Sequence, residues 1–248
     1  MENQTGGLNE PLSVRDRGIR SYVVRSGRMT DMQKDALEHL YDRHGLTWNP
    51  GTMLGTEPVF GRTAQFVVEI GFGMGVATAE IAGALPDTCF IGLEVHAPGV
   101  GKLLSEIEAR GLTNLKVFRH DATEVVDSML LPDSVDGFHI FFPDPWPKKR
   151  HHKRRIMSAG FISALAGKLK PGGYIYFVTD WEEYAWWTLE RMTAEPLLEN
   201  PFAPWATREP WRPVTKFEQK AIRAGRPIRE LRFLKRRPDQ AKKDDSLR

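Results

Sequence analysis

Residues 66–75 read FVVEIGFGMG, and this short stretch decides the fold. Its first five residues are strand-like, and residues 76–85 after it have the pattern of a helix. Gly71, Gly73 and Gly75 permit positive backbone φ angles and let a ligand lie against bare backbone, while the helix behind them offers free amide hydrogens. The stretch predicts a cofactor-binding turn at the end of the first strand of an open α/β sheet. A tight turn without a ligand is the simpler alternative.

Outward from this turn, short apolar runs alternate with helical segments. We expect strands at residues 66–70, 90–95, 115–118, 135–142 and 174–178, and helices at 76–85, 98–110, 157–169, 182–192 and in a short stretch after Asp121. A helix capped by Thr30 is expected to run to about Arg43, and Leu231 and Phe233 indicate a late strand near the sheet edge. This alternation predicts a parallel sheet covered on both faces, with ligands beyond the carboxyl ends of its strands.

The glycine spacing and the acids around it narrow the choice of cofactor. The pattern G-x-G-x-G, with Glu69 two residues before it, differs from the dinucleotide fingerprint G-x-G-x-x-G, and no P-loop occurs. Glu94 ends the second strand, where a carboxylate can accept both ribose hydroxyls, and Asp121 follows the third, where it can take the adenine amine. Carboxylates without a dedicated phosphate-binding cation suit a ligand with sulfonium and ammonium groups, and S-adenosylmethionine has both. Taken singly, Glu94 and Asp121 are equally typical of solvated loop acids.

The fourth strand ends in PDPWP at residues 143–147, and the basic run KKRHHKRR follows at 148–155. Prolines restrict the backbone around Asp144, and Trp146 offers a flat face for a base, a contact worth ~1–3 kcal/mol. Alone, such a run is typical of a solvated stretch, but beside this loop it predicts a rim that binds RNA phosphates. The residues expected to contact RNA are Lys149, Arg150, His151, His152, Lys153, Arg154 and Arg155. No Cys, His and acid spacing resembles a zinc site, so no metal is expected.

Length and composition predict one globular domain. The chain has 248 residues, of which 41% are apolar, and we expect a flexible arm at 1–29, a single domain at 30–237 and a solvated tail at 238–248. The net charge of +3 is too small to indicate a nucleic-acid partner without the local charge distribution. Cys89 is the single cysteine, and no signal pattern or long apolar run occurs. These features predict a cytoplasmic protein with no membrane partner.

Three stretches together carry a resemblance to one family. They are EIGFGMG at 69–75, GLEVH at 92–96 and, above all, the segment 142–155. Over roughly residues 28–236 the chain is similar to bacterial tRNA (guanine-N(7)-)-methyltransferases. The resemblance implies an α/β class I methyltransferase (Rossmann-like) fold with a seven-stranded, mostly parallel sheet, helices on both faces and an antiparallel last strand. It implies methyl transfer from S-adenosylmethionine to nitrogen 7 of guanine 46 in the variable loop of tRNA, by a monomer or a homodimer.

The same resemblance implies roles for individual residues. Cofactor contacts are expected from the glycine turn and from Glu69, Glu94, Asp121 and Asp144, and Asp144 is expected to be the catalytic acid. Substrate contacts are expected from Lys148, Asp180, Thr215, Lys216, Phe217 and Glu218, although Asp180 also has the position of a helix N-cap. Ala221 and the pair Gly225-Arg226 depart from the family pattern, which has a Gly and a Gly-His pair there.

Two other functions share some of these features. Methyltransferases that act on adenine amino groups place a similar acid-and-proline loop at the end of the same strand, by resemblance, but here Trp146 replaces their second proline. A nonenzymatic RNA-binding module with the same fold is the second alternative. An intact glycine turn with its four acids favours the enzyme over that module.

Overall fold

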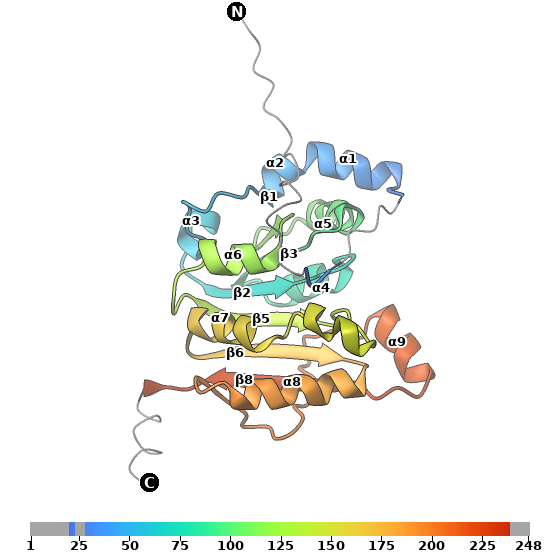
Figure 1. Ribbon diagram of the computed structural model, residues 1–248. Helices are drawn as coiled ribbons and strands as arrows, with labels where there is room; N and C mark the ends of the chain where they lie inside the picture. Colours follow the sequence, from blue (N-terminus) through green and yellow to red (C-terminus); the bar gives the residue numbers. More distant parts are fainter. Residues whose placement is uncertain (1–19, 23–27, 239–248) are drawn as a thin grey trace, which may run out of the picture.

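A computed structural model of the chain describes residues 20–22 and 28–238. Its sheet has the strand order β1-β4-β3-β2-β5-β6-β8-β7 (Figure 1). The strands are β1 (Gly45–Leu46), β2 (Gln65–Ile70), β3 (Thr88–Leu93), β4 (Leu115–Phe118), β5 (Val135–Phe141), β6 (Leu169–Thr179), β7 (Leu198–Glu199) and β8 (Arg229–Lys235). Strands β1 to β6 pair in parallel, whereas β8 pairs antiparallel with both β6 and β7. The predicted, mostly parallel sheet is confirmed, including its antiparallel late strand.

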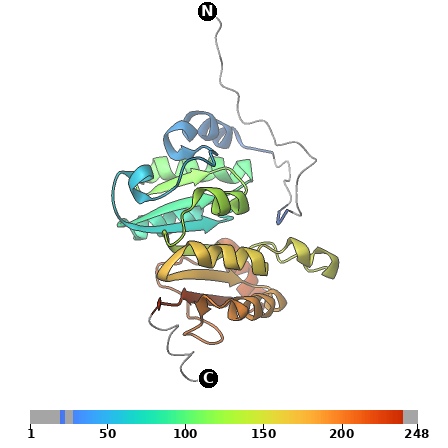
Figure 2. The ribbon, with the colours of Figure 1, turned by 60° about the vertical axis from the view of Figure 1, so that its left-hand side comes forward.

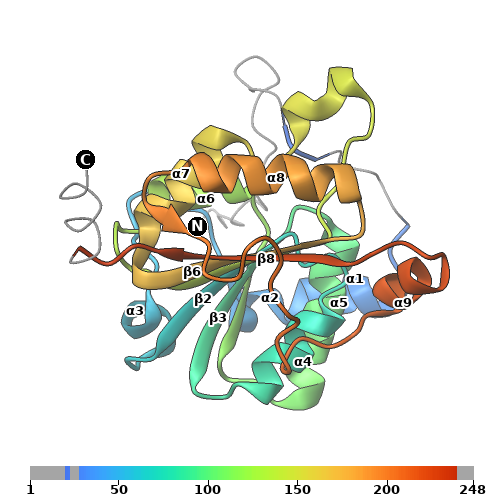
Figure 3. The same cartoon turned by 90° about the horizontal axis from the view of Figure 1, so that it is seen from below.

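Helices cover both faces of this sheet, as the sequence predicts. They are α1 (Asp31–His39), α2 (Tyr41–His44), α3 (Thr56–Phe60), α4 (Val76–Ala84), α5 (Ala97–Arg110), α6 (Ala122–Met129), α7 (Ala159–Lys168), α8 (Glu182–Ala194) and α9 (Lys216–Arg223). Helices α1, α4 and α5 lie on one face, and α6, α7 and α8 lie on the other (Figure 3). Among the described residues, no helix is long and apolar enough to cross a membrane.

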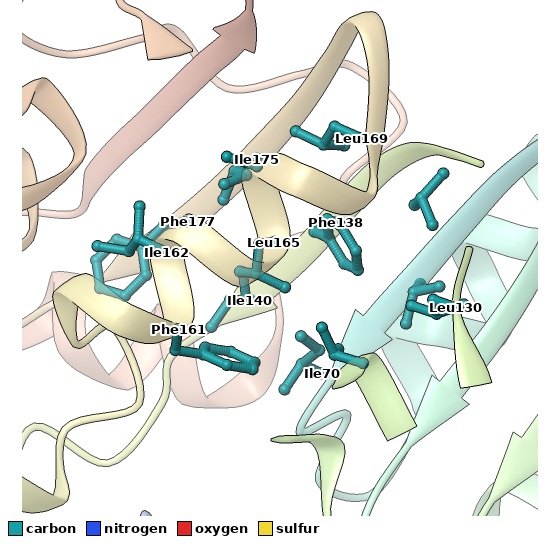
Figure 4. Packing of buried hydrophobic residues seen from close by; sticks show 14 of the residues in the cluster. Ile70, Leu130, Phe138, Ile140, Phe161, Ile162, Leu165, Leu169, Ile175 and Phe177 are labelled. Carbon is teal, nitrogen blue, oxygen red and sulfur yellow. The ribbon is translucent and has the colours of Figure 1, made fainter. Parts of the chain in front are cut away.

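Each face of the sheet has its own core because the strands are apolar on both sides. On the face of α7, Ile162 and Leu165 pack over Phe138, Ile140 and neighbouring strand residues, all fully or almost fully buried (Figure 4). On the opposite face, residues of α4 and α5 pack against β2, β3 and β4. Burial on both sides fixes the strands, and therefore also fixes the positions of the loops at their carboxyl ends.

The structure corrects several predicted boundaries. The predicted helix to Arg43 is two helices, because Leu40 has a ψ angle of −14°, away from the helical value of about −42°. Its N-cap is confirmed, since the Thr30 hydroxyl accepts from the Gln33 backbone N–H at 3.3 Å. Strand β6 begins at Leu169 rather than Tyr174, with a register irregularity opposite Val135 and Gly137. The sheet has eight strands rather than the seven that the resemblance implies, and two of them, β1 and β7, are two-residue strands at its edges.

The expected arm and tail lie mostly outside the described residues. Of the arm, the structure describes residues 20–22 and 28–29, and the predictions for 1–19, 23–27 and 239–248 concern residues outside the description. The described part of the arm is not remote from the sheet. Residues 20–22 (blue in Figure 2) lie beside the loop that follows β5, with the Ser21 carbonyl accepting from the Trp146 indole nitrogen at 3.0 Å.

Candidate active site

The glycine turn joins β2 to α4 in the conformation that its sequence predicts. Gly71, Gly73 and Gly75 have φ angles of 75°, 60° and 72°, a region that side chains disfavour. At Gly75 a side chain is also excluded by space, because a Cβ would lie 2.6 Å from that of Leu103 in α5. Gly71 and Gly73 have no neighbour on their open side. Their bare backbone is therefore available to a ligand.

Glu94, immediately after β3, is hydrogen-bonded to this turn. Its Oε2 accepts from the backbone N–H of Gly73 at 3.0 Å, and its Oε1 accepts from those of Val95 and His96 at 2.7 and 3.0 Å. A carboxylate has about four acceptor positions, and these three hydrogen bonds fill both positions of Oε1 and one of Oε2. Glu94 is thus fixed in place, and its Oε2 can still accept a hydrogen bond from a ribose hydroxyl.

Asp121 caps the helix that follows β4. Its Oδ1 accepts from the backbone N–H and the hydroxyl of Thr123, at 2.9 and 2.7 Å. The neighbouring His120 ring stacks on Trp48, with ring centroids 4.1 Å apart. On the cavity side, burial and the negative charge of Asp121 raise the pKa of Tyr22 to about 12. Asp121 and Tyr22 both line the same cavity.

Glu69 is the one acid of the set that is buried, with 3% of its surface exposed. Burial raises its pKa to about 7, and the negative charge of Glu94 adds to this rise. Its Oε2 is buried without a hydrogen-bond partner among the described residues. Glu69 is not among the residues that line the cavity, so its expected contact with the cofactor stays a prediction.

Asp144 lies in a strained loop after β5. On either side of it, Phe142 and Trp146 have φ angles of 50° and 46°, which are unfavourable for aromatic residues. The Phe142 backbone N–H still bonds the Val178 carbonyl at 2.7 Å, so the strand pairing holds one end of the loop. The Arg154 guanidinium lies over the Trp146 ring, 5.2 Å from its centroid. One face of the predicted stacking platform is therefore occupied by a cation.

These strand ends enclose one cavity. It receives residues from the loops after β2, β3, β4 and β5, which is the place where a parallel sheet binds its ligands. The lining includes Ser21, Tyr22, Gly71, Glu94, Val95, His120, Asp121, Phe142, Pro143 and Asp144. Sequence reasoning missed Ser21 and Tyr22 because nothing in the arm's local pattern indicates its tertiary contact.

Most of the basic run forms a 3-10 helix, η2 (Lys149–Arg154), beside this cavity. Figure 2 shows it projecting from the body of the sheet (yellow). The side chains of Lys148, Lys149, Arg150 and Lys153 are exposed. Arg155 is different: its side chain is completely buried and pairs with Glu183. The side chain of Arg155 has no surface available to a phosphate in this conformation, which argues against its predicted contact with RNA.

The predicted substrate residues near the C-terminus also include both exposed and buried side chains. Thr215 caps α9 by accepting from the Glu218 backbone N–H at 3.1 Å. Glu218 is buried in a bidentate pair with Arg212, at 2.8 and 2.9 Å, and its expected substrate contact stays a prediction. Lys216 and Phe217 are exposed. Phe217 lies 5.3 Å from Phe142, which places α9 next to the Asp144 loop.

Asp180 lies beyond this cavity in a second, open hollow. It pairs with Arg226 at 2.8 Å, and the tryptophans and glutamates of α8 are among the other residues that line the hollow. Arg226 is one of the residues that depart from the family pattern. The ion pair gives Asp180 a partner that the resemblance does not foresee.

Comparisons with known proteins agree with this geometry. The profile of a family described as "Putative methyltransferase" matches residues 63–231. The chain is 49% identical over 230 residues to a tRNA (guanine-N(7)-)-methyltransferase of Burkholderia vietnamiensis (strain G4 / LMG 22486), covering 93% of this chain and 90% of the relative. It is 50% identical over 217 residues to that of Chromobacterium violaceum, covering 88% and 96%.

Solved structures show the same fold at low sequence identity. The 16S rRNA methyltransferase KamB has a TM-score of 0.54 at 15% identity, covering 73% of this chain and 92% of that one. TrmN from Thermus thermophilus has a TM-score of 0.50 at 18% identity, covering 73% and 46%. The fold is that of class I methyltransferases, and at about half identity over most of its length the chain belongs to the tRNA (guanine-N(7)-)-methyltransferase family.

Proposed function

We propose that this protein transfers the methyl group of S-adenosylmethionine to nitrogen 7 of a guanine in tRNA, and that the target is position 46 in the variable loop. The observation that carries the proposal is the single cavity where the glycine turn, Glu94, Asp121 and Asp144 meet, with the exposed cations of η2 beside it. The family relationship supports the same reaction. Because tRNA is the substrate, we expect the protein to act in the cytoplasm, as a monomer or a homodimer.

The residues of the cavity fit this cofactor. S-adenosylmethionine supplies an electrophilic methyl group on a positively charged sulfur. Glu94 has a spare acceptor position for the ribose, Asp121 lines the cavity where it can accept from the adenine amine, and the glycine backbone is open. The buried carboxyl of Glu69 lies behind the turn, and a cationic ligand favours its ionised form. These carboxylates suit a cationic ligand better than a pyrophosphate.

Asp144 acts on the substrate through charge and position. Nitrogen 7 of guanine bears no hydrogen, and its lone pair points outward in the ring plane, so no general base is needed to expose it. Positive charge develops on the purine as the methyl group arrives, and a fixed carboxylate nearby stabilises that charge. The same carboxylate can hold the base by accepting hydrogens from nitrogen 1 and the exocyclic amine.

A nucleoside assay tests the proposed reaction. The protein is incubated with labelled cofactor and tRNA from cells that lack the modification, and the modified nucleoside is identified. We expect 7-methylguanosine, lost when position 46 is changed to adenosine, whereas N6-methyladenosine would identify an adenine amino-group methyltransferase. Failure to bind S-adenosylmethionine would support a nonenzymatic RNA-binding module.

Two substitutions test the role of Asp144. Asp144→Ala and Asp144→Asn should each lower kcat/KM by a factor of about a hundred or more, because both remove the fixed negative charge. Single-turnover rates should not recover at higher pH. A wild-type rate that follows one ionisation near neutrality, with that dependence abolished in Asp144→Asn, would establish a general base instead. Using tRNA with inosine at the target separates the contribution of the exocyclic amine.

A further inference from the structure

Arg155 ends the basic run but has the environment of a core residue. Its side chain has no exposed surface, and its guanidinium lies over two neighbouring rings of α8, 4.8 Å from the Tyr184 centroid and 5.1 Å from that of Trp187. Its charge is balanced by Glu183, to which both terminal nitrogens donate, one of them at 3.1 Å. A charge buried this completely is retained only where its hydrogen bonds are satisfied.

The remaining donors of Arg155 reach the loop that carries Asp144. Nε donates to the carbonyl oxygen of Pro145 at 2.9 Å, and a terminal nitrogen lies 3.2 Å from Nε2 of His152. The Pro145 carbonyl belongs to the peptide group that joins Pro145, the residue after Asp144, to the strained Trp146. A positive φ at an aromatic residue persists only when its surroundings impose it, and this hydrogen bond is the contact that fixes the neighbouring peptide.

Only arginine can make this set of contacts. Its planar fork directs Nε to one acceptor and the two terminal nitrogens to a carboxylate, whereas a lysine ammonium is a single point charge on a flexible stem. Through this fork the loop at the end of β5 is tied to Glu183 in the first turn of α8. The orientation of the Asp144 loop therefore depends on α8, the helix that follows β6 in the sequence.

We propose that Arg155 is a positioning residue for methyl transfer: it holds the Asp144–Trp146 turn so that the Asp144 carboxylate faces the base, and it does not bind RNA. The proposal rests on the proposed function for what the loop does, but not for how the loop is held. Misplacement of a reacting group by about 1 Å can cost about a hundredfold in rate. Loss of the hydrogen bonds of the Arg155 guanidinium should therefore slow the chemical step.

The test compares Arg155→Lys with Lys153→Ala, an exposed cation of the same run. Arg155→Lys keeps the charge, and we expect its single-turnover rate at saturating tRNA and cofactor to fall by about tenfold to a hundredfold. The slope of tRNA affinity against salt concentration should stay unchanged. Lys153→Ala should instead weaken tRNA binding and lower that slope by just under one. A reduced slope with an unchanged rate in Arg155→Lys would overturn the proposal and make Arg155 a phosphate contact.

Two further measurements separate positioning from a general loss of structure. Glu183→Gln should reduce the single-turnover rate in the same direction, and adding it to Arg155→Lys should cost less than the product of the two effects, because both break one contact. Independent effects would contradict the proposal. Calorimetric binding of S-adenosylmethionine by Arg155→Lys should stay within about tenfold of wild type, because of the expected cofactor contacts only Asp144 lies on this loop, whereas Glu94 and Asp121 lie on others. Loss of that binding would show a broader structural role and overturn the proposal.

A spectroscopic signal keeps the test independent of the methylation assay. The indole N–H of Trp146, assigned by comparison with Trp146→Phe, should shift and exchange faster with solvent in Arg155→Lys, because its bond to Ser21 depends on the loop orientation. An unchanged signal would refute the positioning role. If wild-type protein makes no 7-methylguanosine, the proposed function fails, while this signal still decides whether Arg155 holds the loop.

Discussion

Replacing Glu69 by glutamine should stabilise the protein above neutral pH. The Glu69 carboxyl is buried, its pKa is raised from 4.5 to about 7, and one oxygen has no partner among the described residues. Below pH 4.5 the carboxyl is protonated in both the folded and the unfolded chain. Between pH 4.5 and 7 the unfolded chain releases this proton while the folded chain keeps it, so stability falls through this window and levels off above it.

The magnitude follows from the two pKa values. They differ by about 2.5 pH units, and each unit corresponds to about 1.4 kcal/mol, so ionising Glu69 costs the folded state about 3 kcal/mol at pH 8. At pH 5 the same calculation gives about 1 kcal/mol. Glutamine has nearly the same shape and no charge. The free energy of unfolding of Glu69→Gln, taken relative to that of wild type, should therefore rise by about 2 kcal/mol from pH 5 to pH 8.

Urea unfolding at several pH values between 5 and 8 provides the measurement. Glu38→Gln, at an exposed position in α1, is the matched control for the change in net charge. A stability difference between Glu69→Gln and wild type that does not change with pH would refute the reasoning. The second readout is cofactor affinity: a cationic ligand favours ionised Glu69, so S-adenosylmethionine binding should strengthen with pH more in wild type than in Glu69→Gln.

Three further predictions concern the same edge of the sheet. Glu94→Ala should weaken S-adenosylmethionine binding by roughly 1–3 kcal/mol in calorimetry, and unchanged affinity would exclude a ribose contact. Gly99→Ala should weaken it at least ~10-fold, because the new Cβ would lie 2.0 Å from the Gly73 carbonyl oxygen; Gly83→Ala, with its nearest neighbour 3.8 Å away, is the control that should bind normally. Neutralising four cations should lower the salt slope of tRNA binding by about three, whereas merely solvated cations would leave it unchanged. The four are Lys149, Arg150, Lys153 and Arg154.

The local sequence pattern is sufficient to predict the sheet and the glycine turn. Strand-helix alternation and the three glycines act over a few residues, and the structure has the strands, the helices and the positive φ angles where these patterns lie. Strands β1 and β7 have two residues each, which is too short for any period to show. They depend on pairing with β4 and β8 rather than on their own sequence.

At the site, the sequence pattern does not show the tertiary partner of each charged residue. Arg155 continues a run of exposed cations, but its partner Glu183 comes 28 residues later in the chain. Glu218 stands among residues expected to contact substrate, but Arg212 holds it inside. No local pattern distinguishes a cation that faces water from one that meets a distant carboxylate in the folded chain. Only the packing of the helices over the sheet decides this.

The arrangement of charge explains why the site needs both acids and cations and why it keeps them apart. Acids at the strand ends favour a cationic cofactor, but the same acids repel the phosphates of an RNA. The exposed cations of η2 offset that repulsion, yet screening limits their reach to about 8 Å at physiological salt, so they must lie beside the cavity rather than elsewhere on the surface. A protein cation inside the cavity would pair with Asp144 and cancel the charge that the proposed reaction uses. The buried cation Arg155 is neutralised by Glu183 and donates to the Pro145 carbonyl, and under the proposed function this leaves the Asp144 carboxylate for the base.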